Sequence, residues 1–105
     1  MSKTYLIDID QTICHTPERD GVRDYNSATP ILCRISKINQ LYDSGNTIKY
    51  WTSRGASTGL DWGVFTYNQL KSWGCKFHSC ECGKPSYDVW IDDKAINDKD
   101  FFNEK

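Results

Sequence analysis

Hydrophobic and polar positions along the chain follow two different periods. Short apolar runs of strand length lie at residues 4–9, 47–51, 75–80 and 87–91. Two longer segments between these runs carry apolar residues every three or four positions, as one face of a helix does. Strands that alternate with helices indicate a parallel sheet with helices packed on its faces.

The predicted helices have suitable ends. Thr29 can cap the first helix, and Pro30 suits its first position because the missing N–H would be unpaired there. Gly45 is suited to end it. The second helix is predicted over about residues 60–73, and a short helix is expected to close the chain. The polar, turn-rich residues 14–29 are expected to form a loop or flap.

The length of 105 residues fits a single domain, residues 1–105. We expect a three-layer, Rossmann-like α/β domain with a parallel sheet of about four to five strands and helices on both faces. The flap and the first helix take up the residues between Asp10 and Thr52, so no cap domain is expected.

Composition and charge exclude several classes of protein. A net charge of −1 lacks the basic excess of a dedicated nucleic-acid binder. No apolar run approaches the roughly 18 residues that cross a membrane, and the N-terminus does not resemble a signal peptide. The chain has five cysteines, and an odd number argues against a disulfide framework and favours reduced thiols. We therefore expect a cytoplasmic protein that does not insert into membranes.

Acidic side chains follow the first predicted strand, where ligands of parallel sheets bind. Asp8 and Asp10 are two residues apart, so on an extended chain their side chains point the same way. Two neighbouring carboxylates repel unless a cation lies between them, and a hard ion such as Mg²⁺ suits oxygen ligands. A polar strand end or a helix cap is the alternative interpretation.

Polar residues also follow or precede the other predicted strands. Thr52-Ser53-Arg54 comes after residues 47–51 and could bind phosphate oxygens, or could simply cap a turn. Lys84 precedes residues 87–91 and could place a charge near phosphate, or could be a solvated loop lysine. After the last run, Asp92 and Asp93 suit a metal ion or a helix N-cap.

Taken together, these motifs resemble those of the haloacid dehalogenase (HAD) superfamily of phosphatases. Four motifs match over residues 4–97: D-x-D-x-T, a hydroxyl residue, a lysine and an acidic pair, here Asp8, Asp10, Thr12, Thr52, Lys84, Asp92 and Asp93. Within the superfamily, the chain resembles the small capless HAD proteins of bacterial capsule and surface-polysaccharide biosynthesis, in residues 25–30, 52–55, 83–85 and 91–95. Ser53 departs from that subgroup, where alanine is more frequent.

The resemblance implies an Mg²⁺-dependent phosphomonoesterase. Asp8 would be the nucleophile that forms an aspartyl-phosphate, and Asp10 the general acid and base. Thr52, Ser53 and Lys84 would bind phosphate, and Arg54 would bind the rest of the substrate. Mg²⁺ would be bound by Asp8, the main-chain carbonyl of Asp10, Asp92 and Asp93. The expected substrate is a small sugar phosphate or related metabolite, and a homo-oligomer could wall off the open site.

Three other interpretations stay open at this point. A polynucleotide end-phosphatase shares the D-x-D and I-D-D signatures, although the near-neutral charge argues against it. A receiver-like or non-catalytic phosphate-binding module would use a similar sheet, but the receiver acceptor aspartate is missing after the central strand. A zinc module could use four closely spaced residues, Cys75, His78, Cys80 and Cys82.

Overall fold

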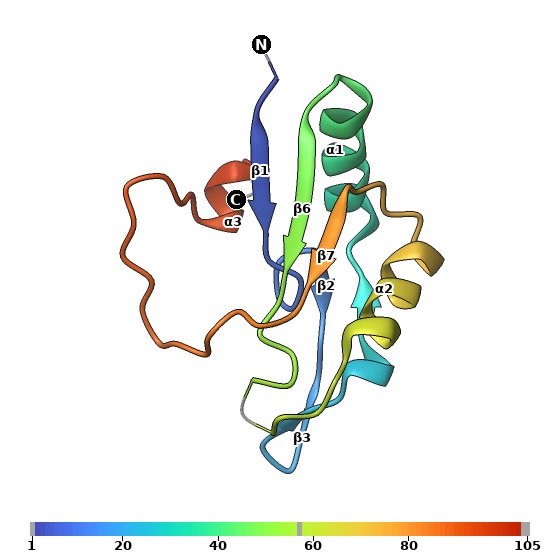
Figure 1. Cartoon of the computed structure of the whole chain (residues 1–105), viewed down its shortest axis with the longest axis vertical. Coiled ribbons are helices and arrows are strands. Elements are labelled where there is room, and N and C mark those ends of the chain that lie inside the picture. The colour runs from blue at the N-terminus through green and yellow to red at the C-terminus, as the bar shows by residue number, and fades with distance from the viewer. Residues whose placement is uncertain (1, 57, 104–105) are drawn as a thin grey trace.

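The computed structural model describes residues 2–56 and 58–103. A three-stranded parallel sheet lies at its centre, with the strand order β1-β6-β7 (Figure 1). Strand β1 spans Thr4–Ile7, β6 spans Thr47–Trp51 and β7 spans Ser79–Glu81. The sheet therefore places the chain segments after β1, β6 and β7 at one end, where the candidate site lies.

Helices cover one face of this sheet. Helix α1 (Leu32–Asp43) packs against β6, and helix α2 (Gly63–Ser72) packs against β7. The short helix α3 (Asp98–Phe101) lies beside β1, where the rings of Phe101 and Tyr5 meet edge to face. The core is one cluster between sheet and helices, with Ile7, Ile48, Tyr50, Ile35, Ile38, Leu70 and Phe102 among its buried members.

Two small antiparallel ladders form within the stretch expected to be a flap. Strand β2 (Cys14–His15) pairs with β5 (Thr29–Pro30), and β3 (Glu18–Arg19) pairs with β4 (Val22–Arg23). The turn between β3 and β4 is Asp20-Gly21, and both residues have positive φ angles of 54° and 77°. This pair suits a two-residue hairpin turn because both positions require left-handed backbone. A 3₁₀ turn, η1 (Tyr25–Ser27), completes the segment.

The predicted three-layer Rossmann-like fold is wrong. The parallel sheet has three strands rather than four to five, and the two other sheets are antiparallel pairs. The register places Leu6, Lys49 and Ser79 side by side on the second face, where no helix packs within the described residues. Leu6 is accordingly 58% exposed. Within the described residues, the sheet therefore has helices on one face and an open second face.

Residues 87–91, all of them described, form no strand. They belong to the C-terminal loop, defined here as residues 82–97, which connects β7 to α3 and stands off from the sheet (Figure 1). Val89 and Ile91 are 74% and 93% exposed. An apolar run of this length becomes a strand only if it pairs with a sheet edge, and this loop arches away from the edge of β1.

Other predicted boundaries shift by a few residues. Helix α1 begins at Leu32 rather than at Thr29-Pro30, because those two residues pair with β2. The third strand begins at Ser79 rather than at Cys75. The expected closing helix is confirmed as α3, where the Asn97 side chain accepts a hydrogen bond from the Lys99 N–H.

Candidate active site

The chain turns sharply just after β1. Gln11 has a φ angle of +63°, in the left-handed region that non-glycine residues rarely adopt. Its side chain compensates by pairing with the backbone of Thr16, donating to the carbonyl at 2.9 Å and accepting from the N–H at 3.3 Å. The fully buried side chains of Ile9 and Ile13 anchor the turn in the core. The loop is therefore fixed, and it holds Asp8 and Asp10 in defined positions.

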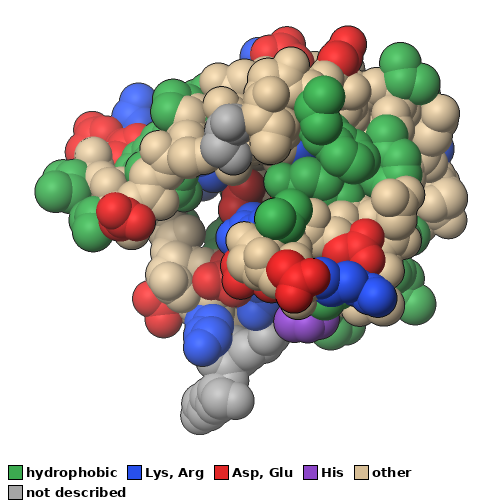
Figure 2. All heavy atoms as spheres, turned by 90° about the horizontal axis from the view of Figure 1, so that it is seen from below, with side chains coloured by type: hydrophobic (Ala, Val, Ile, Leu, Met, Phe, Trp, Pro, Cys, Tyr) green, Lys and Arg blue, Asp and Glu red, His purple; other side chains and the backbone are tan. Residues whose placement is uncertain are grey.

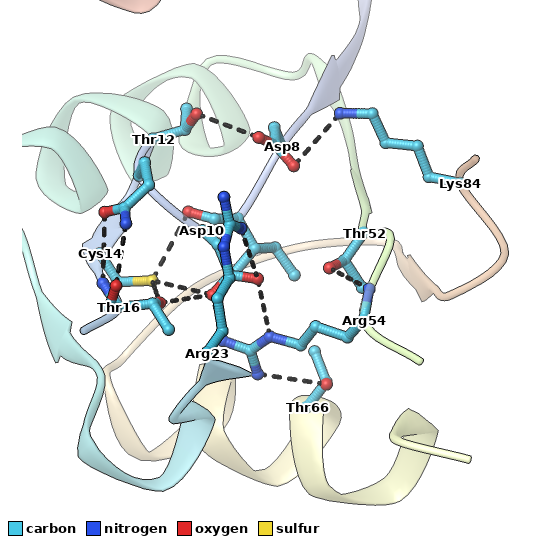
Figure 3. Close-up of polar contacts among 12 residues, drawn as sticks. Asp8, Asp10, Thr12, Cys14, Thr16, Arg23, Thr52, Arg54, Thr66 and Lys84 are labelled. Carbon is cyan, nitrogen blue, oxygen red and sulfur yellow. Dashed lines mark hydrogen bonds and ion pairs between the residues drawn. The ribbon is translucent and has the colours of Figure 1, made fainter. Parts of the chain in front are cut away.

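Asp8 is the more accessible of the two carboxylates, with 36% of its side chain exposed. The ammonium of Lys84 lies 3.2 Å from its Oδ1 atom, and the Thr12 hydroxyl donates to its Oδ2 atom at 3.4 Å (Figure 3). Lys84 comes from the far end of the sequence and is itself buried. The structure thus brings a predicted nucleophile and a predicted phosphate-binding lysine into contact.

Asp10 is buried and faces a different cation. Arg54 donates from Nε to its Oδ2 atom at 3.0 Å and from a terminal nitrogen to its Oδ1 atom at 2.9 Å. The Thr16 hydroxyl donates to Oδ1 at 2.5 Å (Figure 3). Each aspartate therefore has its own cation, and the repulsion expected between the two carboxylates is relieved by Lys84 and Arg54.

The surroundings of Asp10 favour its ionised form. Burial by itself raises the pKa of this carboxyl, but the hydrogen bonds and positive charge of Arg54, with help from Thr16 and Arg23, hold the pKa below its ordinary value. Asp10 is thus a carboxylate at neutral pH. In this state it can accept a proton, whereas to donate one it must first be protonated.

Arg54 is enclosed rather than open to a substrate, so the structure gives it a different place from the predicted one. Its side chain has no exposed area, and it also donates to Thr66 at 3.3 Å and to Gln69 at 2.7 Å, both on α2. The ring of Tyr25 covers its guanidinium at 4.6 Å. Arg54 therefore ties the loop after β1 to helix α2.

Thr52 and Lys84 lie next to each other because hydrogen bonding continues beyond the ends of β6 and β7. The Thr52 N–H donates to the carbonyl of Glu81 at 3.0 Å, and the Lys84 N–H donates to the carbonyl of Thr52 at 3.1 Å. The buried Thr52 hydroxyl accepts from the Arg54 N–H at 3.1 Å, which is the turn-capping role considered above. Ser53 is half-buried in the same turn.

Asp92 and Asp93 do not join this cluster. Both are exposed on the C-terminal loop. Asp92 accepts hydrogen bonds from the Trp90 indole at 3.0 Å and from the Lys94 N–H at 2.8 Å. Figure 2 shows the loop separated from the body of the protein by an open gap, with acidic and basic side chains at its rim. Of the predicted Mg²⁺ ligands, Asp8 keeps a partly exposed carboxylate, but a site with three carboxylates is not assembled.

Two of the residues considered for zinc have different surroundings. Cys75 is buried in the core, and the His78 Nδ1 atom accepts from the Ile48 N–H at 3.1 Å. Within residues 2–56 and 58–103, no three His, Cys, Asp or Glu side chains are grouped as ligands of a metal ion.

Several residues of the site were not predicted from the sequence. Thr16 and Gln69 help to hold the Asp10–Arg54 pair. From the sequence, Tyr25 is a flap candidate for contact with the substrate, and the structure places its ring over Arg54 instead. Thr16 and Gln69 are ordinary polar residues in a loop and a helix, and no motif marks them. Their roles emerge only when the flap and α2 pack against the loop after β1.

Comparisons with known proteins show the fold but no family. No protein-family model and no curated protein matches the chain. The chain is similar to a crystal structure of a protein from Vibrio cholerae, with a TM-score of 0.80 and 20% sequence identity. The match covers 100% of this chain and 90% of the other. At this level of identity the likeness shows a shared fold. Separately, no helix within the described residues is long and apolar enough to span a membrane.

Proposed function

We propose that the protein is a phosphomonoesterase of the HAD type in which Asp8 is the nucleophile. The observation that carries this proposal is the contact between Asp8, which follows β1, and Lys84, which follows β7: the two side chains are 3.2 Å apart. The ammonium of Lys84 reduces the repulsion between the Asp8 carboxylate and a phosphate dianion, so the phosphate can approach Asp8. The free thiols of all five cysteines fit a reducing compartment such as the cytoplasm.

The chemistry proceeds in two displacements. An Asp8 oxygen forms a bond to phosphorus while the bond from phosphorus to the ester oxygen breaks, and Lys84 offsets the charge on the phosphoryl oxygens. A protonated Asp10 gives its proton to the departing oxygen. The resulting Asp10 carboxylate then takes a proton from water as that water attacks the aspartyl-phosphate, which releases inorganic phosphate and restores Asp8.

Arg54 bears directly on the role of Asp10. Its two hydrogen bonds stabilise the carboxylate form, which suits the second displacement, where Asp10 acts as a base. For the first displacement Asp10 must be protonated, which weakens its attraction to Arg54. Because Thr16 and Arg54 hold the Asp10 side chain by hydrogen bonds, they are positioning residues for Asp10.

Mg²⁺ belongs to the proposal as a cofactor bound at Asp8, whose carboxylate is a suitable hard oxygen donor. When bound, such an ion would neutralise charge on the phosphate. Asp92 and Asp93 would have to approach Asp8 to share this ion, so no step above depends on it.

The test is hydrolysis of p-nitrophenyl phosphate by the purified full chain, with Mg²⁺ and with EDTA. Asp8→Asn removes the nucleophile, and Lys84→Met removes the positive charge that contacts the phosphoryl group. Each should lower kcat/KM by at least about 100-fold. Asp43→Asn is the matched control, because Asp43 is an exposed carboxylate paired with Lys76 at the end of α1. Turnover that survives in Asp8→Asn would overturn the assignment.

A further inference from the structure

Three aromatic side chains form a corner beside the candidate site. This aromatic corner consists of Trp51, Tyr87 and Trp90. The rings of Trp51 and Trp90 are 6.1 Å apart and nearly perpendicular at 88°, and those of Tyr87 and Trp90 are 5.3 Å apart at 72°. Together with Pro85, Val89 and Ile91 these rings line a hollow of about 260 Å³.

The aromatic corner adjoins the proposed catalytic groups. The Lys84 ammonium lies 5.1 Å from the centre of the Tyr87 ring and 5.4 Å from that of Trp90. The same ammonium is 3.2 Å from Asp8. Trp51 directly precedes Thr52 in the sequence. A molecule whose phosphate contacts the Lys84 ammonium therefore lies within reach of these rings.

The rings remain accessible to a ligand. Tyr87 is 49% exposed and Trp90 is 40% exposed, although large aromatic side chains are usually more deeply buried. Contact with the Lys84 ammonium explains part of their placement, because cations favour aromatic faces. This contact does not explain the position of Trp51, whose ring lies nearly perpendicular to that of Trp90 and lines the same hollow.

We propose that the aromatic corner binds a ring carried by the leaving group, so that the substrates are phosphate monoesters of ring-bearing alcohols. This inference rests on the proposed function. A nucleoside base can stack on an indole or phenol face, and the apolar face of a cyclic sugar can pack there in the same way. Open-chain phosphate esters such as glycerol 3-phosphate lack this contact.

Binding tests the inference without requiring turnover. In the Asp8→Asn background, phenyl phosphate and methyl phosphate are titrated by calorimetry. Stacking worth about 1–3 kcal/mol corresponds to about 5- to 150-fold tighter binding of phenyl phosphate. Adding Trp90→Ala should remove most of this preference, and so should Tyr87→Ala if Trp90→Ala does not fold. Tyr67→Ala is the matched control, because this half-exposed tyrosine also contacts another aromatic ring edge to face, that of Phe77.

The comparison of two ligands separates stacking from an effect on Lys84. Displacement of Lys84 would weaken both phosphates equally, whereas loss of stacking weakens only phenyl phosphate. Equal affinities of Asp8→Asn for phenyl phosphate and methyl phosphate would overturn the inference. A preference for phenyl phosphate that survives the addition of Trp90→Ala or Tyr87→Ala would also overturn it. In the active protein, kcat/KM for a nucleoside 5′-monophosphate, glucose 6-phosphate and glycerol 3-phosphate identifies which ring is preferred. No advantage of either ring over glycerol would also overturn it.

The two proposals fail in different ways. If no phosphate ester is hydrolysed but phenyl phosphate still binds more tightly than methyl phosphate, the aromatic corner stands and the catalytic proposal falls. If esters are hydrolysed without regard to a ring, the catalytic proposal stands and the inference falls.

Discussion

Two acidic segments of the chain look alike in sequence and differ in their surroundings. In the loop after β1, the apolar residues before and between Asp8 and Asp10 are buried, and each carboxylate contacts a cation. In the C-terminal loop, Ile91 is 93% exposed, and Asp92 contacts only near neighbours in the chain among the described residues. The loop after β1 is fixed by contacts with the sheet and with distant parts of the chain, whereas Asp92 in the C-terminal loop is held by hydrogen bonds to Trp90 and Lys94.

This contrast shows that a carboxylate gains a structural role through the partners that folding brings to it. Asp10 and Arg54 are far apart in sequence, and their pairing joins the loop after β1 to the turn after β6. Asp92 gains nothing comparable. Mutations in the two segments should therefore have very different costs.

The largest difference is expected between Asp10→Asn and Asp92→Asn. Removing the Asp10 charge leaves Arg54 buried without its counter-ion, which should lower the free energy of unfolding by about 3–5 kcal/mol. Asp92→Asn should change it far less, because Asp92 is exposed and contacts only near neighbours in the chain. Urea denaturation followed by fluorescence measures both. Similar costs for the two variants would contradict the contrast.

A smaller loss is expected from Gly55→Ala, in the turn that presents Arg54 to Asp10. Gly55 has a φ angle of +84°, and an added Cβ would collide with the carbonyl oxygen of Leu60. The two effects together should cost about 2–4 kcal/mol. Gly45→Ala is the matched control, because Gly45 also has a positive φ angle of 96° but open space around it. Its cost should stay near about 1–2 kcal/mol, and equal losses would show that the turn can move.

The dependence of the free energy of unfolding on pH tests the ion pair between Asp10 and Arg54. The pKa of Asp10 is lower in the folded protein than its ordinary value of 3.8, so the folded state favours the ionised form. This stabilisation is fully present above about pH 4 and is lost as the pH falls through the folded-state pKa. Asp10→Asn should therefore flatten the fall in stability below about pH 4, compared with the unsubstituted protein. An unchanged slope would mean that Asp10 is not held ionised by Arg54.

The smallest effect is expected at the tip of the C-terminal loop. Ile91→Ser removes an apolar side chain that is already in solvent, so the free energy of unfolding should change by less than about 0.5 kcal/mol. Ile9→Ala, at a fully buried position in the loop after β1, should cost about 2–5 kcal/mol. A large cost for Ile91→Ser would show that residues 87–91 are packed against the sheet in solution.

The sequence was informative wherever a local pattern coincided with a packed element. The apolar runs before Asp8 and before Thr52 form β1 and β6, and the periodic segments form α1 and α2. The position of Asp8 directly after β1 follows from the rule that strand ends gather functional residues, whereas Lys84 was expected to precede a strand at residues 87–91 and instead follows β7. These predictions depend on short-range patterns that the fold reinforces.

The sequence misled where a pattern required a partner that it could not specify. Residues 87–91 have the composition of a strand, but the run is short and follows Gly83 and Pro85, and no neighbouring strand pairs with it in the described structure. Arg54 was identified as a candidate, yet its partner proved to be Asp10. That pairing depends on how the flap and α2 enclose the guanidinium, which no local motif encodes.

The central claim is that Asp8 carries the phosphoryl group during turnover. The most direct measurement is rapid acid quenching during hydrolysis of p-nitrophenyl phosphate, followed by borohydride reduction and peptide mass spectrometry. We predict one reduced acyl-phosphate at Asp8 in the parent protein and in Asp43→Asn, and none in Asp8→Asn. Turnover with no modification at Asp8, or with modification at Asp10 or Asp92 instead, would contradict the account.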